Sequence, residues 1–487
     1  MEDVERRALS NLRFDWAPTP RAVWEPPRAH VEGLNEDVLK AVMAAFTDAD
    51  LDATSNPLGV VITGQQGAGK THMLTAVRAE VQRVGGYFFL VSLLHGRNFW
   101  QNIVHALRAG LYERGPDGAN QLTTLLHRLA DRLVLPDAAR YEVIGKNPVT
   151  RETLDRLVVA LRDADPVHGW KSRHTARAVV LLAAEDPMVQ EIGEAYLTSG
   201  SEAVAGERVQ WGISPDSKPP HEIVRELSAL LAMTGPSLLA VDQIDTLVAQ
   251  SGRSTRTVQV DMGRDELFDQ IGTGLMEVRE SVLRSLTVVA CQFPAWEAIR
   301  TRAHGAAADR FRPEYRLKGV ATPETAEKLV ATRFAPRFAD CGFTPPYPTW
   351  PVRREAFEGA SQFTPRLLFK RIDEHIRSCL DNDVVSELSD LAEQVPTPKP
   401  EAPAEPAVAV SSPLDARFAE LLRNVDLRTA LDKDTEDTRM TTLLGAALQA
   451  YVYELGERGQ HYVVDANWGG EPRVARQAPV CVGRRVR

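Results

Sequence analysis

The sequence predicts an α/β protein built on a parallel sheet with flanking helices, and three observations support this class. Four short apolar runs are typical of buried strands, and each is followed by helical patterning or a polar turn. A glycine-rich turn comes directly after the first run. The second and third runs are separated by a long stretch with helical spacing, which is too long to be a structureless loop.

The predicted strands occupy residues 59–63, 87–92, 237–241 and 286–291. The helical stretch between the second and third strands, about residues 98–220, is expected to be an inserted helical subdomain. Together these segments form a predicted core from residue 1 to residue 320.

Three further segments follow the core. Residues 321–393 contain two amphipathic helices and are predicted to form a small helical lid. Residues 394–413 alternate Pro with Ala, Glu and Ser, which predicts an extended linker. Residues 414–487 form a small module with one helix (440–459) and one strand (461–466). Its abrupt end suggests either a truncated domain or a basic tail, because the last residues are GRRVR.

Composition excludes several protein classes. Hydrophobic residues make up 44% of the chain and charged residues 25%, which is average for a globular protein. The formal net charge of −9 argues against a globally basic nucleic-acid binder. The four cysteines form no CxxC pair, so neither a zinc site nor a disulfide framework is expected. No signal peptide or membrane span is recognisable. The sequence predicts a soluble, cytoplasmic protein with no membrane partner.

A phosphate-binding loop is predicted at residues 64–71, where GQQGAGKT satisfies GxxxxGK[ST]. Glycines let successive backbone N–H groups turn inward around phosphate oxygens, and the following helix presents its positive N-terminus. Lys70 would contact the β- and γ-phosphates, and the Thr71 hydroxyl would bind Mg²⁺. In its strand–helix context the motif predicts a P-loop NTPase. The predicted nucleotide-binding residues are Gly64, Gln65, Gln66, Gly67, Ala68, Gly69, Lys70, Thr71 and His72.

An acidic residue is predicted to complete the metal site. Asp242 follows the apolar strand 237–241 immediately, and a carboxylate at that position can hold the Mg²⁺ shell of a phosphate loop.

The order of these elements resembles the AAA+/STAND group of P-loop ATPases, and most closely the origin-recognition-like initiator branch. In that group the second strand reads hhhhDE, often followed by an apolar residue and Asp. This chain matches at residues 238–241, Asp242, Ile244 and Asp245. The resemblance covers residues 30–377, but the inserted helices match no motif. It implies an ATP-dependent switch acting on a protein or DNA partner, and it allows a homo-oligomer.

Gln243 departs from the family pattern, which places a water-activating glutamate there. A neutral amide can position a water molecule but cannot take its proton. Two consequences are open: hydrolysis is slow, which we favour, or Asp245 or another carboxylate supplies the base.

The resemblance extends to a polar sensor residue and to arginines that face the γ-phosphate. Gln292, at the end of the fourth strand, matches the sensor position. Arg310 and Arg312 match the segment that can carry an arginine finger, which often acts across a subunit boundary. Arg300 and Arg302 are weaker candidates for the same role.

Two other segments match the family near the nucleotide. Arg366 lies in the first turn of a predicted helix, after a proline that suits a helix start, and matches the second sensor of the lid. An arginine there opposes the helix dipole, which favours a phosphate partner. Val31 and Gly33 match the segment that lies near the adenine base.

The sequence therefore predicts an ATP- and Mg²⁺-binding ATPase that acts as a switch. The alternative is a P-loop kinase or nucleotide-dependent transferase with an acceptor site in the helical insertion. A third hypothesis is a nucleotide-bound structural subunit without turnover.

Overall fold

A computed structural model of the chain describes residues 1–12, 20–25, 34–51, 56–92, 98–245, 259–302, 308–391, 462–465 and 473–476. The chain forms two compact units, and the first contains residues 1–253 and 263–395. All of the predicted site residues that the structure describes belong to this first unit.

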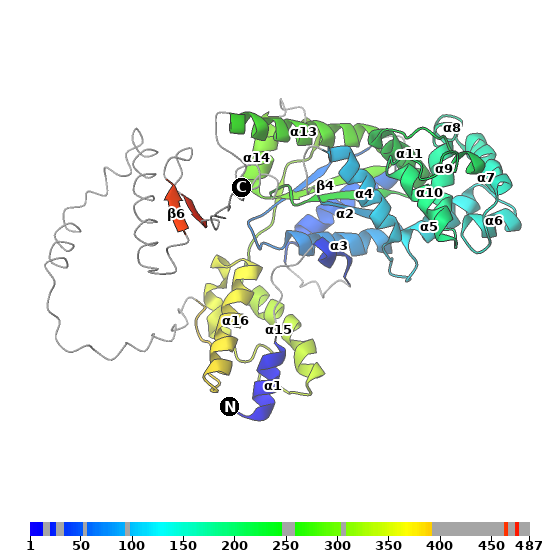
Figure 1. Cartoon of the computed structure of the whole chain (residues 1–487). Coiled ribbons are helices and arrows are strands. Elements are labelled where there is room, and N and C mark those ends of the chain that lie inside the picture. The colour runs from blue at the N-terminus through cyan, green and yellow to red at the C-terminus, as the bar shows by residue number, and fades with distance from the viewer. Residues whose placement is uncertain are drawn as a thin grey trace, which may run out of the picture. The chain divides into compact units, whose positions relative to one another are not determined.

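A five-stranded parallel sheet is the centre of the first unit (Figure 1). The strand order is β2–β3–β4–β1–β5, and every pairing in it is parallel. The four predicted strands are confirmed, whereas β5 was not predicted because a two-residue strand carries no readable periodicity. The strands are β1 (Val60–Thr63), β2 (Tyr87–Ser92), β3 (Ser237–Asp242), β4 (Ser285–Cys291) and β5 (Tyr315–Arg316).

The register brings the carboxyl ends of the strands to one edge. Thr63, the last residue of β1, pairs with Cys291 on one side and with Arg316 on the other. Ser92 pairs with Asp242 in the same way. Ligands of open α/β sheets bind at this edge, so the fold places residues that are distant in sequence next to the turn after β1.

Helices cover both faces of the sheet, because the apolar strands are buried on both sides. One face packs against α2 and α3, in a core that includes Val42, Leu74 and Ile62. The other face packs against α4, α11, α13 and α14 (Figure 1). These helices are α2 (Glu36–Leu51), α3 (Lys70–Arg83), α4 (Phe99–Tyr112), α11 (Pro220–Thr234), α13 (Gln259–Ser281) and α14 (Phe293–Arg302).

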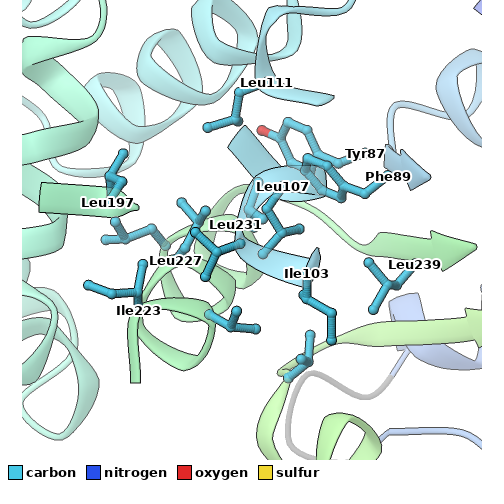
Figure 2. Close-up of a cluster of buried hydrophobic side chains, with 14 of the residues drawn as sticks. Tyr87, Phe89, Ile103, Leu107, Leu111, Leu197, Ile223, Leu227, Leu231 and Leu239 are labelled. Carbon is cyan, nitrogen blue, oxygen red and sulfur yellow. The ribbon is translucent and has the colours of Figure 1, made fainter. Parts of the chain in front are cut away.

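The expected helical insertion is present and joins the sheet through a continuous apolar core. Figure 2 shows α4 presenting Ile103, Leu107 and Leu111, and α11 presenting side chains at the same four-residue spacing, toward Phe89 and Leu239 of the sheet. That spacing places them on one face of each helix. The remaining elements are α5 (Gln121–Arg132), α6 (Asp137–Val143), α7 (Arg151–Ala164), α8 (His168–Lys171), α9 (Arg173–Leu181), α10 (Pro187–Leu197) and η3 (Val209–Trp211).

The two predicted lid helices form as α15 (Pro323–Asp340) and α16 (Pro365–Asp381), with the 3₁₀ helix η5 (Arg354–Gln362) between them. A separate apolar cluster holds them together, and it includes Leu9 of α1 (Asp3–Asn11). The N-terminal helix, which the sequence analysis assigned to the core segment, therefore packs with the lid. The buried residues of this helix are Ala8 and Leu9. Two apolar residues do not indicate from the sequence which element the helix packs against.

Two short 3₁₀ helices also belong to the first unit, η1 (Pro20–Trp24) and η4 (Ala308–Arg310). In the second unit β6 (Tyr462–Asp465) pairs antiparallel with β7 (Arg473–Arg476), and β6 falls within the strand predicted at 461–466. The predicted helix 440–459, the linker, Val31 and Gly33 lie outside the described residues. No helix in the described part of the chain has the length and apolarity to cross a membrane.

Candidate nucleotide-binding site

The predicted phosphate loop connects β1 to α3 at the carboxyl edge of the sheet. Gly67 and Gly69 have φ angles of +82° and +98°. Residues with a side chain rarely adopt such positive φ angles, whereas glycine adopts them at little energetic cost. Gly69 is the N-cap of α3, so the loop ends at a helix N-terminus, where backbone N–H groups and the helix dipole attract anions. The glycine turn and the helix N-terminus are the backbone features that a phosphate-binding loop requires.

Lys70, the first residue of α3, lies over this loop. Its Nζ donates to the carbonyl oxygens of Gly64, at 2.9 Å, and Gln65, at 3.4 Å. Nζ also lies 3.7 Å from Oδ2 of Asp245, and the Lys70 side chain is 12% exposed. The ammonium is therefore held where phosphate oxygens would enter the loop.

Asp242 is the buried carboxyl group of the site and is 4% exposed. Burial raises the pKa of Asp242 to about 6, although the N–H of Gln243 and the charge of Lys70 act in the opposite direction. Oδ1 of Asp242 accepts a hydrogen bond from that N–H at 2.8 Å. A nearby cation stabilises the charged form of a carboxylate that burial has removed from water.

Gln243 has a φ of +66°, which is uncommon for a residue other than glycine. Backbone conformations of this kind cost on the order of 1–3 kcal/mol and cluster at functional sites. Gln243, which stands where the resemblance leads us to expect a glutamate, is thus also the residue with the unusual backbone after β3.

Asp245 joins two of the predicted positions. Besides its ion pair with Lys70, its Oδ1 accepts the backbone N–H of Gln292 at 2.7 Å. Gln292 follows β4 immediately, and its carbonyl oxygen accepts the N–H groups of Ala295 and Trp296 at the start of α14. The structure therefore brings Lys70, Asp245 and Gln292 together.

The lid contacts the phosphate loop through Arg366. Its backbone N–H donates to the carbonyl oxygen of Gly67 at 3.3 Å. A Cβ on Gly67 would lie 2.5 Å from the Cβ of Arg366, so the two segments touch. The Thr364 side chain caps α16 by accepting the N–H of Leu367, which fixes the start of the helix at the loop.

Arg310 and Arg312 lie elsewhere. The carbonyl of Arg310 and the N–H of Arg312 bond to Gly59, at the amino end of β1. That end is about 13 Å from Thr63, at 3.3 Å per residue. Their side chains pair with Glu280, at 3.3 Å, and Asp48, at 2.6 Å. The structure does not bring them to this chain's own phosphate loop.

The weaker candidate Arg300 pairs with Glu297 at 2.7 Å, within α14.

Arg316, for which the sequence predicts no role, lies at the carboxyl ends of the strands beside the loop. It pairs in register with Thr63, and its guanidinium lies 4.6 Å from the ring centroid of Phe293. Leu317, the next residue, bonds to the carbonyl of Thr63 at 2.7 Å. An alternation of apolar and polar residues around 311–317 is the only sequence signal that could have revealed this short edge strand.

The residues present fit a magnesium ion. Mg²⁺ binds proteins through one or two carboxylates together with phosphate oxygens and waters. Asp242 and the Thr71 hydroxyl, next to Lys70 in the first turn of α3, are donors of that kind, and the desolvated Asp242 carboxylate would gain from a cation. No group of three or more His, Cys, Asp or Glu gathers within the described residues. Phosphate oxygens and waters are the usual further ligands of a protein-bound Mg²⁺.

The parallel sheet, the glycine loop at the N-terminus of α3 and the carboxyl group at the end of β3 define an α/β P-loop NTPase fold. No protein-family model and no curated protein matches the chain. Among solved structures, the ORC2 protein of Aeropyrum pernix, in its ADPNP–ADP complexes, is similar at 11% identity. The match covers 91% of this chain and 80% of that one, with a TM-score of 0.37. At these values, the assignment of the site depends on the geometry described above.

Proposed function

We propose that this chain is an ATP-binding P-loop ATPase of the AAA+/STAND type that acts as a nucleotide-dependent switch. The observation that carries the proposal is the meeting of three elements at one loop. Lys70 lies over the glycine turn, the acidic end of β3 faces it, and the first turn of α16 contacts Gly67. A nucleotide bound there would touch the sheet core and the lid at once.

Each residue has a distinct role in this proposal. The N–H groups of residues 64–71 and the Lys70 ammonium hold the β- and γ-phosphates. Thr71 and Asp242 hold Mg²⁺, which neutralises charge on the phosphate oxygens. The Arg366 side chain begins at the loop and supplies a positive charge from the lid.

Hydrolysis is slow in this proposal because the site has no ready base for the attacking water. The amide of Gln243 orients a water but does not accept its proton. One oxygen of the Asp245 carboxylate, Oδ1, accepts the N–H of Gln292 and is not free to take a proton from water. The ATP-bound state therefore persists long enough to act on a partner, which is a protein or DNA.

Calorimetric titration of the chain with ATP and ADP, each with and without Mg²⁺, tests the proposal. We expect the Lys70→Ala variant to lose at least about 30-fold in affinity, as expected when a charged hydrogen-bond partner is removed. Lys40→Ala is the matched control, because that lysine is 78% exposed on α2. Equal ATP affinity in both variants would contradict the assignment of the loop.

A role for Arg310 and Arg312 is proposed only between copies of the chain, because both lie away from the loop of their own chain. If they act as arginine fingers, hydrolysis should rise with protein concentration, and the Arg312→Ala variant should remove that rise. A rate per chain that is independent of concentration would exclude this role.

A further inference from the structure

Asp245 lies between two parts of the site that are far apart in sequence, Lys70 and Gln292. Its side chain is 19% exposed and lies 3.7 Å, through Oδ2, from Nζ of Lys70. Its other oxygen, Oδ1, accepts the N–H of Gln292. One carboxylate thus connects the start of α3 to the start of α14.

Acceptors of the chain itself surround the Lys70 ammonium in this arrangement. The ammonium has three hydrogens to donate, and the chain offers the carbonyls of Gly64 and Gln65 and the carboxylate of Asp245. A phosphate group that entered the loop would compete with Asp245 for Lys70. It would also bring negative charge close to that carboxylate, and like charges at this distance repel strongly in a partly buried site.

We propose that Asp245 is an internal counter-ion that holds Lys70 in the nucleotide-free chain and is displaced when phosphate binds. Because Asp245 also holds the N–H of Gln292, its displacement shifts the first turn of α14. Asp245 is therefore a positioning residue that reports the state of the phosphate loop to α14. This inference rests on the proposed nucleotide binding and adds a mechanism of regulation to it.

The substitution Asp245→Asn separates the two contacts. An asparagine oxygen still accepts the N–H of Gln292, but the amide carries no charge to compete for Lys70. We expect Asp245→Asn to bind ADP and ATP about five- to tenfold more tightly than the unmodified chain in the absence of Mg²⁺, since a partly buried ion pair no longer has to be broken. Asp163→Asn is the matched control, because Asp163 pairs with Arg162 on the surface of the helical insertion.

Hydrogen exchange of the α14 amides distinguishes this role of Asp245 from a purely structural one, which would not make the exchange depend on nucleotide. In the unmodified chain, ADP should change the exchange of the first turn of α14, and in Asp245→Asn this dependence on nucleotide should be lost. Asp245→Ala, which removes both contacts, should bind Mg²⁺-free nucleotide more tightly and also exchange faster at α14 without nucleotide.

The outcomes distinguish this inference from the proposed function. Unchanged or weaker nucleotide affinity in Asp245→Asn, with Lys70→Ala still defective, overturns the counter-ion role and leaves nucleotide binding intact. Lost hydrolysis with unchanged affinity also overturns it, and would assign Asp245 as the base. If the unmodified chain binds neither ATP nor ADP, the proposed function and this inference both fail.

Discussion

The backbone N–H of Arg366 donates to the carbonyl oxygen of Gly67 at 3.3 Å, so the first turn of the lid helix α16 rests on the phosphate loop. The contact joins segments that are 299 residues apart (366 − 67). It depends on the absence of a side chain at Gly67, where a Cβ would lie 2.5 Å from the Cβ of Arg366. Lid position and loop conformation are therefore coupled in this fold.

Gly67→Ala should displace the lid from the loop and weaken nucleotide binding. Gly118→Ala is a matched control, because Gly118 has φ +81° against +82° for Gly67 but has open space around its Cβ position. Both substitutions pay about 1–2 kcal/mol for the left-handed backbone, and only Gly67→Ala adds the clash with Arg366. Denaturant unfolding and ATP titration of both variants measure the difference. Equal losses of stability and of ATP affinity in the two variants would show that the contact between Gly67 and Arg366 does not contribute to nucleotide binding.

Gln243→Glu should accelerate hydrolysis on the order of 10²-fold, because a carboxylate can take the proton of the attacking water and general-base catalysis contributes about that much. Gln243→Ala serves as the control, since it offers no base and should stay slow. Single-turnover phosphate release measures both. No acceleration in Gln243→Glu would contradict the assignment of this position.

Leu9→Ala should destabilise the lid by about 2–5 kcal/mol, the usual cost of truncating a buried leucine. Leu9 is 1% exposed, in the apolar cluster that α1 shares with α15 and α16. Val4→Ala, at an exposed position of the same helix, should change stability by less than about 0.5 kcal/mol. Hydrogen exchange of α15 and α16 reports the effect, and unchanged protection in Leu9→Ala would separate α1 from the lid.

Stability of the helical insertion should fall as the pH drops from about 6.5 toward 4. Burial, with the charges of Arg173, Lys218 and Arg177, lowers the pKa of His174 to about 4 in the folded chain, although its hydrogen bond to Gly212 opposes this. A histidine in the unfolded chain has a pKa near 6.5. Between pH 6.5 and pH 4 the unfolded state therefore binds more protons than the folded state, and the free energy of unfolding decreases as the pH falls.

His174→Gln removes this contribution and should lose less stability over the same interval. Denaturant midpoints measured between pH 4 and 7 test the prediction. Identical pH dependence in the variant and the unmodified chain would contradict the role of His174.

The sequence predicted the sheet and the glycine turn after its first strand because the signals of both are local. Four of the five strands of the sheet are continuous apolar runs, and Gly64, Gly69, Lys70 and Thr71 have the spacing of the GxxxxGK[ST] motif. Asp242 was readable because it ends an apolar strand. These features can be recognised in the sequence without knowing which segments pack against them.

The rest of the site depends on contacts between distant segments. The pairing of Arg316 with Thr63 arises from a two-residue edge strand, and the link from Asp245 to Gln292 joins the ends of two strands. Arg310 and Arg312, the arginine-finger candidates from the family resemblance, bond to the amino end of β1 of their own chain. Periodicity and motif spacing say nothing about such placements, because they follow from sheet register.

Single-turnover hydrolysis of prebound ATP, with Lys70→Ala as the blank, distinguishes a slow nucleotide switch from an ordinary ATPase. We expect the unmodified chain, with Mg²⁺, to release free phosphate and ADP at a rate below about 0.01 s⁻¹, the range of phosphate-loop enzymes that lack full activation. Release faster than about 1 s⁻¹, the range of ordinary enzyme turnover, would contradict the slow switch. Transfer of the γ-phosphate to another molecule would instead identify a kinase.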